Sequence, residues 1–186
     1  MEIIETMLAG VKLLKPIRFG DNRGFFAETY NCRVFEGLGI DVDFIQDNHS
    51  ISSVVGTVRG LHFQAPPSAQ AKLVRCGRGA IFDVAVDIRC GSSTYGQWVG
   101  YELSAENGIQ LYIPSGFAHG FVTLEHNSEI IYKCSDYYDA KTEGSLRWND
   151  PELRIEWPIV GDVIIKEHDA KAPLFVNFNS PFGLEE

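Results

Sequence analysis

The segment Arg59-Gly-Leu-His-Phe-Gln64 combines strand-forming residues with three side chains capable of polar chemistry. His62 supplies an imidazole, which exchanges protons near neutral pH and therefore serves well as a general base. A single polar residue within a strand usually marks a solvated face. Here several neighbouring strand patterns contain polar residues, which together indicate a barrel lumen with a polar lining. These residues are Lys72, Arg75, Asp83, His119 and Tyr132.

The elements that would position these side chains are short strands. Gly, Pro, Asn, Asp and Ser recur about every 8 to 12 residues between runs of Val, Ile, Tyr and Phe, a rhythm typical of an all-β sandwich or barrel. The number of strands exceeds what a flat open sheet usually holds, which favours two packed sheets or a closed barrel. The predicted strands are 11–17, 25–30, 42–52, 54–64, 71–76, 80–88, 97–103, 109–113, 119–124 and 129–135.

Alternation is clearest in residues 80–88, where the even-numbered apolar residues face one way and the odd-numbered residues face the other. One short helix is predicted at 31–38, with Asn31 as its N-cap and Gly39 at its end. The stretch from Asp162 contains prolines and few periodic residues. This composition indicates short helical turns and coil near the C-terminus.

Composition indicates the class of protein. The 186 residues are 45% hydrophobic and 22% charged, which fits a single globular domain over residues 1–186. A net charge of −9 argues against non-specific nucleic-acid binding. The acidic N-terminus argues against a signal peptide, and the lack of a long apolar run argues against a membrane segment. Four scattered cysteines without a CxxC motif predict free thiols in a reducing cytoplasm.

A second group of residues, Ile113-Pro-Ser-Gly-Phe-Ala-His-Gly-Phe121, has a Pro-x-Gly-x-x-His spacing that resembles the second motif of the cupin superfamily. In metal-binding cupins the first motif contains His-x-His followed by Glu. The corresponding residues here are His62, Gln64 and Lys72. A lysine ammonium repels a divalent cation and offers it no lone pair. We therefore expect a cupin-type jelly-roll barrel without a catalytic metal.

The sequence closely resembles the dTDP-4-dehydrorhamnose 3,5-epimerase family, the metal-free cupins of dTDP-L-rhamnose biosynthesis. The similarity extends in order over most of residues 11–158, and the combination of motifs is highly specific. The matching stretches are Phe19-Gly-Asp-Asn-Arg-Gly-Phe-Phe26, Phe44-Ile-Gln-Asp-Asn-His-Ser50, Arg59-Gly-Leu-His-Phe-Gln64, Lys72-Leu-Val-Arg75, Phe82-Asp-Val-Ala-Val-Asp87, Tyr95-Gly-Gln-Trp98, Ile113 to Phe121, and Trp148-Asn-Asp-Pro151.

The resemblance implies a cofactor-independent reaction on a 4-keto-6-deoxy sugar joined to dTDP. C3 and C5 both flank the C4 ketone, so enolate formation acidifies a proton at either carbon. The family match assigns His62 as the base, paired with Asp169, and Tyr132 as the acid on the opposite face. The family match also implies that Lys72 stabilises the enolate oxygen. Asp83 and His119 match a second polar pair in the site.

The resemblance also assigns the nucleotide contacts and an assembly. Residues around the diphosphate and sugar match Arg59, Gln46, Asn48 and Lys72, and Tyr138 matches an aromatic position near the nucleotide. An N-terminal arm is implied to cross to the second subunit of a homodimer. In that arm Arg23 would reach the phosphates, Phe26 would stack on thymine and Glu28 would bond to its edge.

Two assignments remain open at the level of the sequence. Arg59 and His62 are separated by an odd number of residues, so strict alternation places them on opposite faces. Either a bulge at Gly60 re-aims one of them, or Arg59 reaches around the strand end. Near the C-terminus, Glu167 or His168 could replace Asp169 as the neighbour of His62.

Three alternative functions are distinguished by their chemistry. An epimerase acting only at C3 would keep the same fold and residues. A metal-dependent cupin is disfavoured by Gln64 and Lys72. A binding protein without catalytic activity would need neither His62 nor Tyr132.

Overall fold

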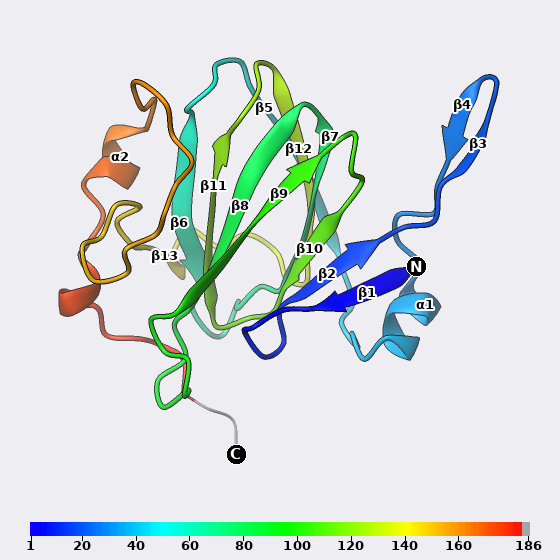
Figure 1. Cartoon of the computed structure of the whole chain (residues 1–186). Coiled ribbons are helices and arrows are strands. Elements are labelled where there is room, and N and C mark those ends of the chain that lie inside the picture. The colour runs from blue at the N-terminus through cyan, green and yellow to red at the C-terminus, as the bar shows by residue number, and fades with distance from the viewer. Residues whose placement is uncertain (184–186) are drawn as a thin grey trace.

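The computed structural model describes residues 1–183, and its main feature is two antiparallel β-sheets packed face to face (Figure 1). In spatial order the six-stranded sheet contains β1 (Glu2–Glu5), β2 (Lys12–Lys15), β10 (Gln110–Ile113), β7 (Lys72–Arg78), β12 (Ser128–Cys134) and β5 (Gln46–Ser52). The five-stranded sheet contains β13 (Glu143–Ser145), β6 (Val58–Gln64), β11 (Phe117–Thr123), β8 (Ala80–Asp87) and β9 (Trp98–Ser104).

This arrangement confirms the predicted all-β, jelly-roll type of fold, with two facing sheets that do not close into one hydrogen-bonded barrel. Three short strands, β1, β3 and β13, were not predicted. The predicted strand 25–30 is wrong beyond Phe26, because β4 (Gly24–Phe26) pairs only with β3 (Phe19–Asp21). The predicted strand 42–52 begins only at Gln46, because Val42 and Phe44 pack against the cluster around α1.

The alternation predicted for residues 80–88 is confirmed, and both faces of β8 are buried. Ile81 and Ala85 lie in the core between the two sheets. Val84 and Val86 face outward, where residues that follow β13, including Leu146, cover them. The five-stranded sheet is therefore covered on its outer face by the C-terminal third of the chain.

The helices agree with the sequence-based predictions. α1 (Cys32–Gly37) is capped by Asn31, whose side chain accepts a hydrogen bond from Arg33 N, and Gly39 follows with a positive φ of 72°. α2 (Glu167–Ala170) and the 3-10 helix η1 (Phe175–Asn177) are the short turns near the C-terminus. Among residues 1–183, no helix is long and apolar enough to cross a membrane.

The hairpin of β3 and β4, here called the arm, projects away from the two sheets (Figure 1). Its apolar side chains Phe19, Phe25 and Phe26 are exposed, and the Arg18 guanidinium lies 4.3 Å from the centroid of the Phe25 ring. Aromatic rings on a projecting hairpin find no core within their own chain. They are available for a contact with another molecule.

Candidate active site

A cavity of about 820 Å³ opens between the two sheets beside α2. A smaller cavity of about 330 Å³ lies next to it, and His62, Lys72 and Tyr132 line both cavities. The larger cavity brings together seven predicted site residues, and the smaller one adds Gln46 and Asn48. The seven are Arg59, His62, Lys72, His119, Tyr132, Tyr138 and Asp169.

A bulge in β6 resolves the odd spacing of Arg59 and His62. In the pairing with β11, His62 lies opposite His119 and Arg59 opposite Phe121, so β6 contains one residue more than its partner. Gly60 occupies this position with φ of 112°, and a Cβ there would lie 2.6 Å from Gly120 Cα. The extra residue lets both Arg59 and His62 line the cavity.

His62 forms a hydrogen-bonded pair with Asp169, whose Oδ1 lies 2.9 Å from His62 Nε2. The Asp169 side chain is buried and its Oδ2 accepts a hydrogen bond from Gly60 N at 3.3 Å. Burial alone would raise the pKa of Asp169, but the hydrogen bonds and the charge of His62 hold that pKa below its usual range. An ionised carboxylate only accepts hydrogen bonds, so the proton of neutral His62 lies on Nε2 and the lone pair on Nδ1.

The segment before α2 brings Asp169 to β6. Val58 N donates to Ile164 O at 2.8 Å, and Ile164 N donates to Gly56 O at 3.0 Å, so this segment pairs with the start of β6. α2 follows directly and packs against β6. Glu167 instead faces Lys171, with its Oε1 2.5 Å from the ammonium. The geometry therefore favours Asp169 over Glu167 as the partner of His62.

A second histidine–carboxylate pair adjoins the same cavity, which His119 lines and the buried Asp83 does not. His119 Nε2 is 2.8 Å from Asp83 Oδ1, and both side chains are buried. Burial lowers the pKa of His119, although the Asp83 charge opposes this effect. Asp83 Oδ2 has no hydrogen-bond partner among the described residues. A neutral imidazole is therefore fixed in orientation beside His62.

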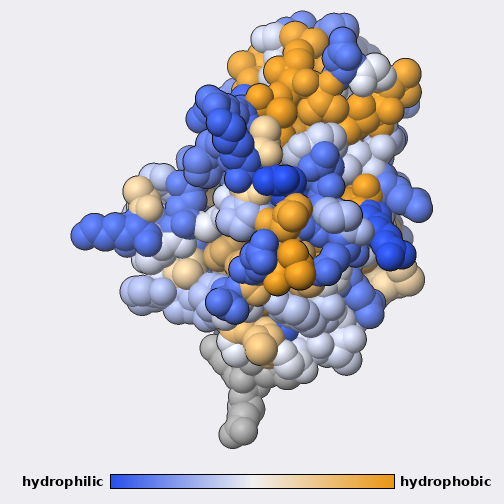
Figure 2. Space-filling view, turned by 90° about the vertical axis from the view of Figure 1, so that its left-hand side faces the viewer, coloured by the Kyte–Doolittle hydropathy of each residue, from blue (hydrophilic) through white to orange (hydrophobic). Residues whose placement is uncertain are grey.

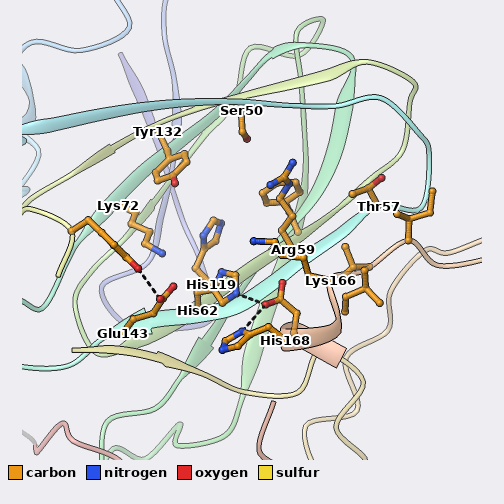
Figure 3. Close-up of a pocket in the computed structure, with 16 residues that line it drawn as sticks. Ser50, Thr57, Arg59, His62, Lys72, His119, Tyr132, Glu143, Lys166 and His168 are labelled. Atoms are coloured by element: carbon orange, nitrogen blue, oxygen red, sulfur yellow. Dashed lines mark hydrogen bonds and ion pairs between the residues drawn. The ribbon is translucent and has the colours of Figure 1, made fainter. Parts of the chain in front are cut away.

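Lys72 and Tyr132 come from the sheet that faces β6, so they lie on the cavity wall opposite His62 (Figure 3). Burial lowers the pKa of Lys72. The nearby Cys134, Asp83 and Glu143 partly offset this lowering by their electrostatic interaction with the ammonium. Burial also raises the pKa of Tyr132, so its phenol keeps its proton at neutral pH. The cavity thus has a base on one wall and a proton donor on the other.

Amide side chains hold the loop that contains Tyr138. Gln46 Oε1 accepts from Tyr138 N at 3.0 Å, and Gln64 Oε1 accepts from Asp139 N at 2.8 Å. Gln64 Nε2 also donates to Ser68 O and Tyr137 O. The hydroxyl of Tyr138 donates to Glu143 Oε2 at 2.9 Å. Gln64 therefore supports the wall of the cavity.

The predicted arm residues do not join the cavity of their own chain. Arg23 is exposed and pairs with Asp21 at 2.5 Å. Phe26 is 71% exposed and Glu28 is also exposed. None of the three lines either cavity described for residues 1–183. The structure of one chain therefore leaves them without a role in its own site.

Four polar residues of the cavity wall were not predicted from the sequence. Ser50 shares the face of Gln46 and Asn48 at a spacing of two, so period-two alternation could have found it. No comparable signal pointed to Thr57, to Lys166 or to Glu143, which lies on a strand of three residues. The four are Ser50, Thr57, Glu143 and Lys166.

Gln64 and Lys72, which stand where metal-binding cupins have ligands, have other roles in this structure. The Gln64 amide is consumed by backbone groups, and Lys72 presents an ammonium to the cavity. Within residues 1–183, no cluster of three or more His, Cys, Asp or Glu side chains is arranged to hold a metal ion.

Comparison with known proteins identifies relatives across nearly the whole chain. The sequence profile of dTDP-4-dehydrorhamnose 3,5-epimerases matches residues 5–177. A protein of that name from Salmonella typhimurium is 54% identical over 175 residues, covering 94% of this chain and 95% of its own. The crystal structure of a Legionella pneumophila 3,5-epimerase with dTDP-4-keto-L-rhamnose has a TM-score of 0.95 at 44% identity, covering 100% of this chain and 98% of that chain.

A 3'-monoepimerase from Streptomyces bikiniensis, solved in complex with dTDP-quinovose, has a TM-score of 0.86 at 32% identity. The alignment covers 92% of this chain and 86% of that one. The fold and site define a jelly-roll enzyme whose cavity contains a histidine–carboxylate pair opposite a tyrosine. The chain belongs to the dTDP-4-dehydrorhamnose 3,5-epimerase family.

Proposed function

We propose that this enzyme converts dTDP-4-dehydro-6-deoxy-D-glucose to dTDP-4-dehydro-L-rhamnose in dTDP-L-rhamnose biosynthesis. The observation that carries the proposal is the His62–Asp169 pair facing Tyr132 across one cavity. An epimerisation next to a ketone requires a proton to leave from one face and return to the other. A base and an acid on opposite walls meet that requirement.

The chemistry can be assigned to particular atoms. His62 Nδ1 removes the proton at C3 or C5, and the electrons pass to the C4 oxygen as an enolate. The Asp169 carboxylate stabilises the imidazolium that forms. The Lys72 ammonium stabilises the enolate oxygen. Tyr132 then returns a proton to the carbon from the opposite face, so the configuration inverts.

The nucleotide would occupy the outer part of the cavity. Arg59 and Lys166 place two cations on its wall, where they suit a diphosphate. Arg59 is already oriented by hydrogen bonds to Ser52 Oγ at 3.2 Å and Ile51 O at 3.3 Å. Gln46 and Asn48 provide amides, and Tyr138 provides an exposed ring for contact with the base.

The arm would complete this site in a homodimer, with each arm reaching the cavity of the other subunit. Arg23 would then contact the phosphates, Phe26 the thymine ring and Glu28 the edge of the base. Figure 2 displays an apolar area at the upper edge of the face that carries α2. Ile164, an exposed apolar residue of the cavity wall, and Val54 in the loop after β5 suit contact with aromatic rings.

We place the enzyme in the cytoplasm. All four cysteines are free thiols, and Cys76 and Cys134 are buried. Free thiols suit a reducing compartment.

The test is proton NMR of dTDP-4-dehydro-6-deoxy-D-glucose with the enzyme in heavy water, in the presence of a chelator. We expect the C3 and C5 proton signals both to disappear as solvent deuterium replaces them. The His62→Asn variant is the matched control and should leave both signals intact. Exchange at neither position with the wild-type enzyme would refute the proposed substrate.

Loss of the C3 signal alone would favour a second candidate, an epimerase that acts only at C3. The structural similarity to the Streptomyces bikiniensis 3'-monoepimerase supports this candidate. The two reactions use the same base and differ in which ring carbon reaches it.

A further inference from the structure

The Asp169 carboxylate is contacted by two imidazoles. His62 Nε2 lies 2.9 Å from Oδ1, and His168 Nδ1 lies 3.4 Å from the same oxygen (Figure 3). The other oxygen, Oδ2, accepts from Gly60 N. The His62–Asp169 pair therefore belongs to a group of three side chains, in which His62 and His168 both contact the single negative charge of Asp169.

The three side chains differ in their access to water. The Asp169 side chain is 5% exposed, that of His62 is 33% exposed and that of His168 is 70% exposed. His168 can therefore exchange protons freely with the solvent while it contacts a buried carboxylate. Histidine is the side chain that proteins commonly use as a pH switch.

We propose that His168 is a positioning residue that, once protonated, shares the Asp169 charge and lowers the proton affinity of His62. This inference deepens the proposed function, and its kinetic test rests on that function. A positive charge on the same carboxylate oxygen disfavours a second proton on His62. The base therefore stays neutral, and active, to a lower pH than a simple histidine–carboxylate pair would allow.

The charged neighbours of His168 leave Asp169 as its acidic partner. Glu167 pairs with Lys171 on the same helix. Arg59 on β6 is held by Ser52 and by Ile51 O. Among residues 1–183, Asp169 is the one acidic side chain that forms an ion pair with His168. The remaining charged or titratable groups on the cavity wall are His62, Lys72, His119, Tyr132, Tyr138, Glu143 and Lys166.

Two substitutions separate the charge of His168 from its bulk. His168→Gln removes the charge, and His168→Lys makes it permanent. We expect the acid limb of the kcat/KM profile to move up by about half a pH unit in His168→Gln, because the opposing charge is lost. In His168→Lys the limb should stay at or below the wild-type position. His126→Gln alters an exposed histidine whose Nδ1 lies 3.2 Å from Ser53 O, away from the cavity wall; this variant is the matched control and should leave the profile unchanged.

NMR titration of the imidazoles, without substrate, provides a readout independent of turnover. The His62 signals are assigned by their absence in His62→Asn. We expect His62 to titrate at a higher pH in His168→Gln than in the wild type, and the difference to shrink in high salt. An identical His62 titration in both proteins would overturn the inference. If that titration shifts as expected but no substrate exchange occurs, the proposed function fails and the coupling stands.

Discussion

At the scale of single residues, the Asp169 carboxylate decides which nitrogen of His62 acts as the base. Because the carboxylate accepts a hydrogen bond from Nε2, the lone pair must lie on Nδ1. Asp169→Asn would keep the shape of the side chain but would lose the charge that stabilises the imidazolium. We expect kcat to fall by about 10²- to 10⁴-fold, as measured by steady-state kinetics. Glu167→Gln, which alters a neighbouring carboxylate outside the cavity, should keep normal turnover.

Tyr132 tests the other half of the reaction. Its pKa is raised by burial, so the phenol is a proton donor at neutral pH. In Tyr132→Phe, His62 can still remove and return a proton on its own face. We therefore expect deuterium exchange in heavy water to continue while inverted product falls by about 10²-fold or more. NMR can follow both quantities in one sample. If exchange stopped together with inversion, Tyr132 would have a role earlier than reprotonation.

At the scale of elements, the bulge in β6 aligns the catalytic residues. A Cβ at Gly60 would lie 2.6 Å from Gly120 Cα and 2.7 Å from His119 O, and its φ is 112°. We expect Gly60→Ala to lower the free energy of unfolding by more than about 1 kcal/mol and to reduce kcat as His62 moves. At Gly37 in α1 an added Cβ would meet no neighbouring side chain or backbone within 4 Å, so Gly37→Ala should leave the free energy of unfolding nearly unchanged. Urea denaturation and kinetics measure the two effects.

The end of β8 supplies a prediction about acid stability. The buried Asp87 accepts hydrogen bonds from Arg89, Ser92 and Thr94. Burial opposes ionisation, but these bonds lower the pKa of Asp87 from 3.8 to about 2. The pKa is lower in the folded state, so this stabilisation is present above about pH 4 and disappears as the pH falls toward 2.

Asp87→Asn should therefore lower the free energy of unfolding at pH 7 by roughly 2 kcal/mol. The difference from the wild type should shrink below pH 4, as measured by urea denaturation across pH. Asp41→Asn alters an exposed aspartate and serves as the control. A difference that did not depend on pH would place the effect in packing rather than in the charge.

These elements also explain what the sequence could predict. The alternation in β8 is local, so it was visible in the residues themselves. The bulge in β6 depends on how His119 and Phe121 pair with it, and only Gly60 hinted at it. β13 has three residues and no periodicity of its own, so Glu143 could not be placed. The contact of His62 with Asp169 joins residues 107 positions apart and was predicted only through the family resemblance.

At the scale of the whole molecule, the proposed exchange of arms can be tested by mixing inactive subunits. His62→Asn damages the cavity, and Arg23→Ala with Phe26→Ala damages the arm. If arms act on the partner subunit, each mixed dimer contains one intact site. Random mixing of equal amounts should then restore about a quarter of the wild-type activity, since half the dimers are mixed.

Activity assays before and after subunits are exchanged measure this recovery. A mixture that remains as inactive as its components would show that the arm does not act across subunits. The arm variant alone should show mainly a raised KM, because its cavity keeps His62 and Tyr132. The mixing assay therefore uses a substrate concentration far below that raised KM, at which the arm variant is almost inactive. Light scattering gives the mass of the assembly independently of activity.

The C-terminal third of the chain both covers the outer face of the five-stranded sheet and contributes Asp169. A ribosome completes this part last, so a nascent chain has every other catalytic group before it has the carboxylate. A chain without this segment would leave Val84, Val86 and Ile88 uncovered on the sheet, and exposed apolar surface of this kind favours aggregation. The segment that buries this apolar surface is thus the segment that brings the carboxylate to His62, so one packing event both covers the sheet and completes the catalytic pair.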